Sequence, residues 1–293
     1  MKIRVAARGS LLSRIQAEKV IHKLNEYGLQ TELIEVRTRG DRNQDAPLYT
    51  LGKGVFEKEV NLAVLQGIAD IAVHSMKDLP TDLVDGLSIA AVLDRDPPFD
   101  AIVGKSLLSL DQGDVVGTSS IRRKNMILAY NNQLQIKEIR GNVDTRIRKL
   151  KEGDYDALIL AEAGLRRIGE NGFERIDPKI VTPEANQGII AIITTENSKV
   201  REYVKELNNE DVMIEAIAER AVVNKLKGGC NVPLGVLFKK EDGKLFGIAG
   251  YASDFKKVTV DITWKSTEPE EAGSRLGKIL VEAMKNEGIV LKT

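Results

Sequence analysis

Residues 189–194 read Ile-Ile-Ala-Ile-Ile-Thr and decide how the chain is arranged. This run is too apolar for a surface linker, and a short continuous apolar run is typical of a strand that is buried on both faces of a sheet. It comes after two similar sets of strands and helices. We therefore predict that the chain crosses back at this point and completes the sheet that its N-terminal residues begin.

Short β-type runs alternate with amphipathic helical stretches through both sets, which is the pattern of parallel sheets with helices on their faces. Before residue 94 the predicted elements are strands at 3–7, 31–36, 68–73 and 87–92 and helices at 11–27 and 55–66. In the second set they are strands at 115–116, 136–139 and 157–160 and helices at 120–130, 143–151 and 163–168. The proline-containing segment 94–98 interrupts the pattern and marks a boundary or crossover.

The chain beyond Asn208 has a different order of elements. The predictions there are helices at 212–226 and 269–287 and strands at 232–238, 245–251 and 258–264. The fold class is therefore expected to be α/β, with two domains hinged at two crossovers and a smaller α+β C-terminal domain. The expected domains are residues 1–93 with 189–207, residues 99–183, and residues 211–293.

Composition excludes several classes of protein. The 293 residues correspond to about two domains, or three small ones, at roughly 150 residues per domain. A formal net charge of zero with 42% hydrophobic and 29% charged residues is the profile of a globular chain rather than a disordered one. No purely apolar run exceeds five residues, so no membrane span is expected. The N-terminus has no signal-peptide core, and we expect a cytoplasmic protein.

The supply of cysteine and histidine limits the possible cofactors. One cysteine, Cys230, excludes an internal disulfide, and with only two histidines beside it a Cys/His zinc site is also excluded. Only carboxylate-rich sites could hold a metal ion. We expect no metal, and a cofactor that is organic if there is one.

Overall neutrality conceals a basic segment. Residues 119–151 contain nine Lys and Arg side chains against Glu138 and Asp144, a net charge of +7. A solvated helical face explains many such runs, and nucleic-acid phosphates are a second alternative. Aromatic residues make up only 4% of the chain, which disfavours a base-stacking surface. A small carboxylated or phosphorylated ligand fits the segment better.

The start of the helix predicted at 120–130 favours this interpretation. Thr118, Ser119 and Ser120 stand at the N-cap, and Arg122 and Arg123 fall in the first turn. Unpaired backbone N–H groups and the helix dipole would converge on an anion there, although ordinary capping explains the hydroxyl residues equally well. Arginine so early in a helix is unfavourable for the dipole, which suggests another use for it. The segments 140–146 and 8–10 repeat the pattern after two other strands.

Two further positions are candidates for chemistry. Asp78 follows the strand predicted at 68–73, where the carboxyl ends of α/β strands face a binding crevice, and it could act as a general acid or stabilise a cation. A turn residue is the commoner role for such an Asp, as a buried structural role is for His74. Cys230 follows Gly228-Gly229, a turn that would expose the thiol, so covalent attachment is nearly as plausible as a core position.

Seven motifs, in this order along nearly the whole chain, resemble the hydroxymethylbilane synthase family, also called porphobilinogen deaminases. They are Arg8-Gly9-Ser10, Thr38-Arg39-Gly40-Asp41, Gly52-Lys53-Gly54-Val55-Phe56, His74-Ser75-Met76-Lys77-Asp78, Gly117-Thr118-Ser119-Ser120-Ile121-Arg122-Arg123, Arg140-Gly141-Asn142-Val143-Asp144-Thr145-Arg146 and Gly228-Gly229-Cys230. The resemblance implies two hinged domains similar to type-two periplasmic binding proteins and a third domain carrying Cys230. It also implies a dipyrromethane cofactor bound to Cys230 through a thioether.

The implied reaction adds four porphobilinogen units head to tail to this primer, each with loss of ammonia, before water releases linear hydroxymethylbilane. Asp78 matches the family's catalytic acid, which would protonate the departing amine and hold the positive charge that deamination leaves. The residues implied to bind the cofactor are Cys230, Arg122, Arg123, Arg146, Lys77, Ser75, Thr118, Ser119 and Ser120, and those implied to bind substrate are Arg8, Ser10, Arg140, Phe56 and Gln187. Porphobilinogen is the expected partner of a monomer that binds neither nucleic acid nor membrane.

Four positions depart from the family pattern. Leu11 replaces a frequent proline, Leu51 a frequent glycine, Phe99 a frequent arginine and Asn186 a usual glycine. These changes affect the expected loop geometry and the role of residue 99. The strongest alternative function is a noncatalytic two-lobed receptor for a small carboxylate, which would leave Asp78 and the Gly-Gly-Cys turn unexplained.

Overall fold

The computed structural model describes residues 2–38, 57–227 and 232–291, which form two compact units. The first unit consists of Met1–Asp96 and Gly188–Met213. Its five-stranded sheet has the order β2-β1-β3-β10-β4. The strands are β1 (Lys2–Arg8), β2 (Gln30–Val36), β3 (Ile71–Ser75), β4 (Leu87–Val92) and β10 (Ile190–Thr195). The helical elements are α1 (Leu11–Glu26), α4 (Lys58–Leu65), η1 (Met76–Asp78), α8 (Arg201–Val204) and η3 (Lys205–Leu207).

Helix α1 is stabilised by a cap at each end and by a buried apolar face, all of which are visible in the sequence. The Ser10 hydroxyl caps its N-terminus by accepting from the Ser13 amide at 3.4 Å. Gly28, just beyond its C-terminus, has φ of 76°, which suits glycine. Between these ends Ala17, Val20 and Leu24 are fully buried at helical spacing. They pack on the β1, β3 and β10 side chains and form the core of the first unit.

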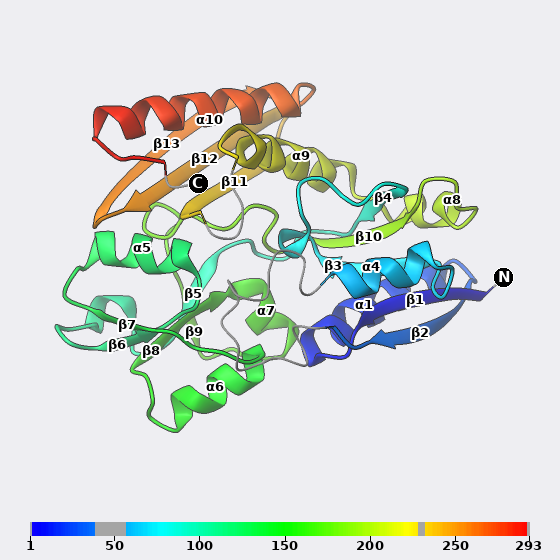
Figure 1. Cartoon of the computed structure of the whole chain (residues 1–293), viewed down its shortest axis with the longest axis horizontal. Coiled ribbons are helices and arrows are strands. Elements are labelled where there is room, and N and C mark those ends of the chain that lie inside the picture. The colour runs from blue at the N-terminus through cyan, green and yellow to red at the C-terminus, as the bar shows by residue number, and fades with distance from the viewer. Residues whose placement is uncertain (1, 39–56, 228–231, 292–293) are drawn as a thin grey trace. The chain divides into compact units, whose positions relative to one another are not determined.

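The second unit, Pro97–Gln187 and Ile214–Thr293, contains two sheets (Figure 1). The five-stranded sheet has the order β7-β6-β8-β5-β9, and its strands are β5 (Asp100–Gly104), β6 (Val115–Gly117), β7 (Gln135–Lys137), β8 (Ala157–Ala161) and β9 (Phe173–Arg175). Its helices are η2 (Leu107–Ser109), α5 (Ile121–Tyr130), α6 (Val143–Lys151) and α7 (Glu162–Arg167). The other sheet is an antiparallel meander of β11 (Leu234–Glu241), β12 (Lys244–Ser253) and β13 (Lys256–Lys265).

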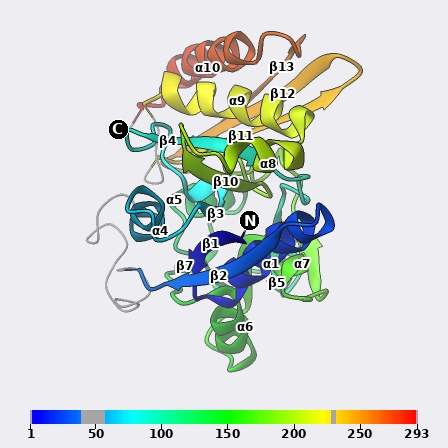
Figure 2. The same ribbon diagram turned by 90° about the vertical axis from the view of Figure 1, so that its right-hand side faces the viewer.

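Two long helices accompany the meander, α9 (Glu210–Lys225) and α10 (Pro269–Asn286). They lie beside each other in both views (Figures 1 and 2). Gly273 of α10 allows this close approach, because a Cβ there would lie 2.1 Å from the carbonyl oxygen of Ala218 on α9. Leu276, Leu280 and Met284 of α10 are buried against the strands and complete the C-terminal core.

The predicted return of the chain is confirmed, since β10 pairs with β3 and β4 and completes the first sheet. The expectation of parallel sheets is wrong in part. In the first sheet β10 is antiparallel to both neighbours, and in the second β5 is antiparallel to β8 and β9. Strand β5 is the first strand after the chain passes from the first unit to the second, and β10 is the first after it returns. Both strands enter their sheet at the end opposite to that of their neighbours.

Most predicted elements are present, with shifted ends. The strand expected at 68–73 begins only at Ile71, because Ile68 is half exposed in the turn before it. Strands β5 and β9 were not predicted. The expected helix at 55–66 is described from Lys58, and its first residues lie outside the described part of the chain. Within that described part, no helix is long and apolar enough to cross a membrane.

Candidate active site

The turn that carries Asp78 is fixed by its apolar neighbours. Met76 and Leu79 are buried, and the Met76 amide donates to the carbonyl of Ile189 at 2.9 Å, which ties the turn to the start of β10. Because residues 76 and 79 face the core, Lys77 and Asp78 face outward. Asp78 is exposed and Lys77 half-buried. Asp78 therefore follows the carboxyl end of β3 with its side chain exposed.

Three other predicted residues belong to the first unit. Ser75 is half-buried, and its hydroxyl accepts a hydrogen bond from Gln16 Nε2 at 2.6 Å. Arg8 ends β1, and Ser10 caps α1. Ser75 and Ser10 thus already have partners within the fold.

His74 is a structural residue in this unit. It is 5% exposed, and its Nε2 lies 2.9 Å from Oδ1 of Asn61. Burial, assisted by the positive charge of Arg8, lowers the pKa of His74 to about 3. A ring that stays neutral over the physiological range and faces the core agrees with the structural interpretation of this histidine.

The second unit buries two guanidinium groups at the start of α5. Ser120 is the N-cap, and its hydroxyl accepts from the Arg123 amide at 3.4 Å. Arg122 and Arg123 are 3% and 6% exposed. Both bind the fully buried Asp100 at the start of β5. Arg122 Nη1 lies 2.6 Å from Oδ2, and Arg123 Nη2 lies 2.7 Å from Oδ1.

This group carries an excess positive charge. Burial alone would raise the pKa of Asp100, but the charges of Arg122 and Arg123 outweigh that effect and hold the pKa well below its ordinary value. One ionised carboxylate thus faces two guanidinium groups. Gln187 supplies neutral contacts, because its Nε2 donates to Asp100 Oδ1 at 3.1 Å and to the Pro98 carbonyl at 2.8 Å. One positive charge remains uncompensated within the group.

Arg122 has the donors that an additional anion would need. Its Nη1 donates to Asp100 and to the Thr182 carbonyl, both at 2.6 Å. Its Nε and Nη2 are buried and have no hydrogen-bond partner among the residues that the structure describes. These two nitrogens form one edge of the guanidinium, the fork that grips a carboxylate with two parallel hydrogen bonds. The residues present therefore fit a carboxylate-bearing cofactor or substrate.

The start of α6 adds two arginines to the same region. Arg140 Nε donates to Glu138 at 3.0 Å, while its Nη2 is buried without a partner among the described residues. Arg146 Nε donates to the Gly141 carbonyl at 2.8 Å. Burial first, and then the charges of Arg123 and Arg140, lower the pKa of Arg146 to about 10. The electrostatic influence of Arg123 and Arg140 on Arg146 indicates that the three side chains belong to one basic neighbourhood.

The hydroxyl residues of the 117–123 motif order its backbone. Thr118 is buried, and its Oγ1 accepts from the Ser120 amide at 3.2 Å. Ser119 Oγ donates to the carbonyl of Ile139, at the end of the neighbouring loop. These bonds join the two helix starts that the sequence singled out.

The predicted site residues therefore fall into two groups. Arg8, Ser10, Ser75, Lys77 and Asp78 belong to the first unit. The second unit holds a larger group, consisting of Thr118, Ser119, Ser120, Arg122, Arg123, Arg140, Arg146 and Gln187. Phe56 and Cys230 lie outside the described residues, as does Leu51.

Two departures from the family pattern have a visible physical basis. Asn186 has φ of 63°, a left-handed conformation in which glycine is favoured and asparagine is the best-tolerated alternative. Phe99 lies under the guanidinium of Arg175, whose Cζ is 4.2 Å from the ring centroid. Leu11, the first residue of α1, is half exposed. The arginine that contacts residue 99 is therefore Arg175, which belongs to β9.

Sequence reasoning missed Asp100, Thr182 and Lys257. Asp100 comes two residues after Pro98 in a segment that gives no sign of burial, and its partners are 22 and 23 residues away. Thr182 acts through its backbone carbonyl, which no side-chain pattern reveals. Lys257 Nζ donates to the carbonyls of Lys179 and Ile180, although its neighbourhood in the sequence is that of an ordinary strand.

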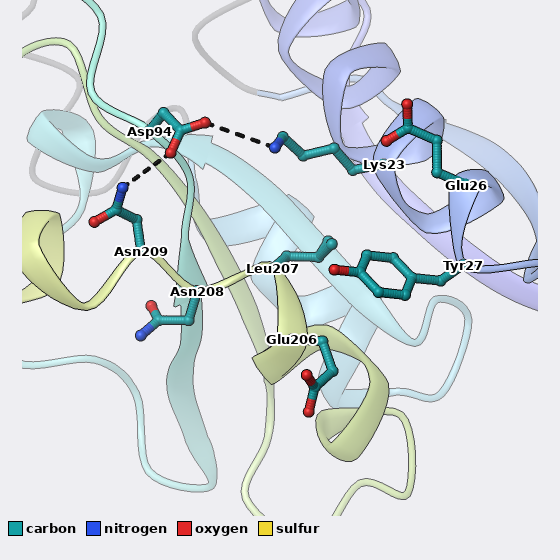
Figure 3. A pocket seen from close by; sticks show the side chains of 8 residues that line it. All are labelled: Lys23, Glu26, Tyr27, Asp94, Glu206, Leu207, Asn208 and Asn209. Atoms are coloured by element: carbon teal, nitrogen blue, oxygen red, sulfur yellow. Dashed lines mark hydrogen bonds and ion pairs between the residues drawn. The ribbon is translucent and has the colours of Figure 1, made fainter.

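A cavity of about 250 Å³ lies elsewhere in the first unit (Figure 3). Asp94 is one of its lining residues and lies 3.6 Å from Lys23 Nζ and 2.9 Å from Asn209 Nδ2. None of the predicted site residues lines it. Within the described ranges, no cluster of three or more His, Cys, Asp or Glu residues could hold a metal ion.

The two five-stranded sheets have matching strand orders. Strand β10, which comes after all strands of the second of these sheets, completes the first one, so the second sheet is inserted into the chain of the first. This arrangement defines an α/β protein. Its second unit contains a buried guanidinium cluster with donors that a carboxylate could use. Family models agree, since "Porphobilinogen deaminase, dipyromethane cofactor binding domain" matches residues 3–202 and "Porphobilinogen deaminase, C-terminal domain" matches residues 213–286. The chain belongs to the porphobilinogen deaminase family, a family of transferases.

Relatives match over the whole length. A protein of Sulfurisphaera tokodaii named "Probable porphobilinogen deaminase" is 48% identical over 293 residues, 99% of this chain and 100% of that protein. A protein of the same name from Saccharolobus islandicus is 50% identical with the same coverage. Among solved structures, the methionine binding protein MetQ aligns with a TM-score of 0.44 and 15% identity, over 75% of this chain and 94% of that chain.

Proposed function

We propose that this chain condenses four porphobilinogen molecules head to tail on a covalently bound dipyrromethane, with loss of four molecules of ammonia, and that water then releases linear hydroxymethylbilane. The observation that carries the proposal is the buried edge of Arg122, whose Nε and Nη2 have no partner among the described residues. A buried guanidinium edge is costly unless an anion occupies it. The pyrrole units carry an acetate and a propionate each and would supply that anion.

The basic cluster of the second unit would hold the cofactor. Arg122, Arg123 and Arg146 would bind its carboxylates, supported by the hydroxyl groups of Thr118, Ser119 and Ser120, with Ser75 and Lys77 contributing from the first unit. When bound through Cys230, dipyrromethane supplies the pyrrole carbon to which the first substrate unit is joined. Each charge-assisted contact from these residues would contribute about 1.5–3 kcal/mol.

Substrate binding would use a second set of side chains. Arg8, Ser10, Arg140, Phe56 and Gln187 would orient each incoming porphobilinogen, with Arg140 offering its buried Nη2 to a carboxylate. Gln187 is fully buried beside Asp100 and Arg123, so its contribution would be to hold Arg123 in place.

Asp78 would be the catalytic acid. Its carboxyl group is exposed and follows a strand end, so a ligand can reach it. It would donate a proton to the departing amine and then, as carboxylate, stabilise the positive charge on the substrate pyrrole nitrogen. Lys77, its neighbour in the turn, would draw a substrate carboxylate toward it.

We further propose that the protein works as a cytoplasmic monomer of three domains, at residues 1–93 with 189–207, 99–183 and 211–293. The matches of separate family models to residues 3–202 and 213–286 support a division near residue 210.

Intact mass measurement tests the proposed function. Protein produced in cells that make porphobilinogen should carry an acid-stable adduct of dipyrromethane mass, and Cys230→Ser should carry none. The rival function, a receptor for small carboxylates, predicts no adduct on either protein. An adduct on Cys230→Ser would contradict the assigned attachment point, and an unmodified starting protein that still forms hydroxymethylbilane would contradict the role of the primer.

A further inference from the structure

The segment 177–183 contacts both α5 and the C-terminal meander, and it provides one of the hydrogen-bond acceptors of Arg122. Its Thr182 carbonyl accepts from Arg122 Nη1 at 2.6 Å. Thr182 is fully buried, and its hydroxyl donates to the Pro178 carbonyl at 2.9 Å, which closes the segment on itself. The place of this carbonyl helps to decide the direction in which the Nε and Nη2 edge of Arg122 points.

The meander holds the segment by contacts that leave no room for adjustment. A Cβ on Gly235 of β11 would lie 2.2 Å from the Thr182 carbonyl oxygen, and a Cβ on Gly250 of β12 would lie 2.4 Å from its hydroxyl. Real Cβ atoms do not come so close to another atom, so only glycine permits this packing. The Val236 amide also donates to the Pro183 carbonyl at 2.7 Å. The strands therefore fix the backbone of residues 182 and 183.

Lys257 fixes the other part of the segment. Its Nζ donates to the carbonyl of Ile180 at 2.8 Å and to that of Lys179. Burial lowers the pKa of Lys257 to about 8, with the nearby charge of Arg122 acting in the same direction and Asp177 opposing it. Among the residues that the structure describes, the hydrogen-bond partners of Lys257 Nζ are these two carbonyls, and the ammonium group is kept there although burial and the charge of Arg122 both disfavour it. We therefore assign Lys257 a structural role, which is to hold the backbone of residues 179 and 180.

We propose that Lys257, Gly235 and Gly250 of the C-terminal meander position Arg122 through the Thr182 carbonyl, so that its Nε and Nη2 edge is directed toward the carboxylate that it binds. Lys257 is a positioning residue, because it acts on the ligand through Arg122. The part concerning the carboxylate rests on the proposed function, whereas the effect on Arg122 does not. By this route the meander, whose first strand begins four residues after Cys230 in the sequence, also shapes the anion site.

The first test observes Arg122 directly in the full chain labelled with ¹⁵N-arginine. The Nε–H resonance of Arg122, assigned by its absence from Arg122→Lys, should shift in Lys257→Met and exchange with solvent at least about tenfold faster. Lys257→Arg retains a donor and should restore slow exchange. Lys244→Met removes an exposed lysine from the same sheet and should leave the resonance unchanged. An unaltered Arg122 resonance in Lys257→Met overturns the proposal.

The second test concerns the ligand. In protein produced with porphobilinogen available, intact mass should show a loaded fraction that is at least about threefold lower in Lys257→Met than in Lys244→Met, since one charge-assisted contact is misdirected. Adding Lys257→Met to Arg122→Lys should cause no further loss, because both act through the same group. Additive losses overturn the positioning role. If the unsubstituted chain carries no adduct, the proposed function has failed, while the Arg122 resonance still decides the positioning role.

A second variant, which acts by steric contact, distinguishes an effect on Arg122 from a general loss of stability. Gly250→Ala leaves Lys257 in place but pushes on Thr182, and it should disturb the Arg122 resonance in the same way as Lys257→Met. If either variant unfolds, the other, with thermal unfolding measured alongside, still decides the matter. A folded Gly250→Ala with a native Arg122 resonance contradicts the proposed route.

Discussion

Arg123 directs both Nε and Nη2 to a single oxygen of Asp100, Oδ1, at 2.9 and 2.7 Å. The other oxygen is left to Arg122. One carboxylate therefore orients two guanidinium groups whose positions in the first turn of α5 would otherwise bring their charges into conflict with each other and with the helix dipole.

Replacement of Asp100 by Asn should destabilise the fold strongly. Removing the negative charge leaves two buried cations without a counter-ion, and such losses cost about 3–5 kcal/mol. Urea denaturation would measure the free energy of unfolding, with the exposed Asp111→Asn as the control, for which a change within about 0.5 kcal/mol is expected. A small loss for Asp100→Asn would mean that the fully buried carboxylate is not what holds the pair.

Replacement of Asp78 by Asn should abolish turnover without removing the cofactor. The amide cannot donate a proton to the amine or balance a positive charge, and loss of at least ~10²-fold in kcat is expected. Asp82→Asn, an exposed carboxylate four residues further on, makes the same charge change and should retain nearly full activity. Steady-state kinetics and intact mass on both variants decide the role, which near-normal turnover of Asp78→Asn would refute.

His74 should make the native state sensitive to acid. Its pKa is about 3 in the folded chain, against an ordinary value of 6.5. Below pH 6.5 the unfolded chain binds a proton that the native state does not bind, so the free energy of unfolding falls as the pH drops toward 3. Between pH 6.5 and 5 this loss is about 2 kcal/mol.

Urea denaturation at these two pH values measures the effect. His74→Gln should lose about 2 kcal/mol less than the unsubstituted chain over this interval, because glutamine does not titrate. The exposed His22 is the matched control, and His22→Gln should follow the unsubstituted chain. Equal acid sensitivity of His74→Gln and the unsubstituted chain would show that another group is responsible.

Asn186 should tolerate glycine better than alanine. The left-handed φ of 63° costs an alanine about 1–2 kcal/mol that glycine does not incur. Both variants keep the backbone N–H that donates to Glu219, so they differ mainly in this backbone preference. Urea midpoints should place Asn186→Ala below Asn186→Gly, and the reverse order would contradict a requirement for the left-handed region.

Much of the fold could be predicted because its signals are local. Hydrophobic spacing and caps identify α1, α5 and α10, and the apolar run at 189–194 identifies β10 as part of the first sheet. The antiparallel direction of β10 was not predicted, because a buried apolar run has the same hydrophobic pattern in a parallel and in an antiparallel strand. Strand β5 was missed because it begins only two residues after Pro97-Pro98, and the three-residue β9 is too short to show an alternation.

The candidate site was predictable in its composition and less so in its contacts. The basic cluster at two helix starts follows from Arg122, Arg123, Arg140 and Arg146 in the sequence, and all four residues belong to the second unit. The internal carboxylate that holds two of them comes from a strand start outside that segment. Contacts between distant residues depend on packing, which a single sequence does not encode in any local pattern.

The arrangement of the first sheet sets the order in which a newly made chain can mature. Strand β4 ends at Val92, yet its partner in the sheet, β10, is complete only at Thr195. At roughly 5–20 residues per second, translation takes on the order of 5–20 s to cover this interval. During that time the sheet of β5 to β9 can already form, whereas β3 and β4 lack the strand that pairs with both of them. Chaperones that shield nascent chains should therefore engage this N-terminal portion for longest.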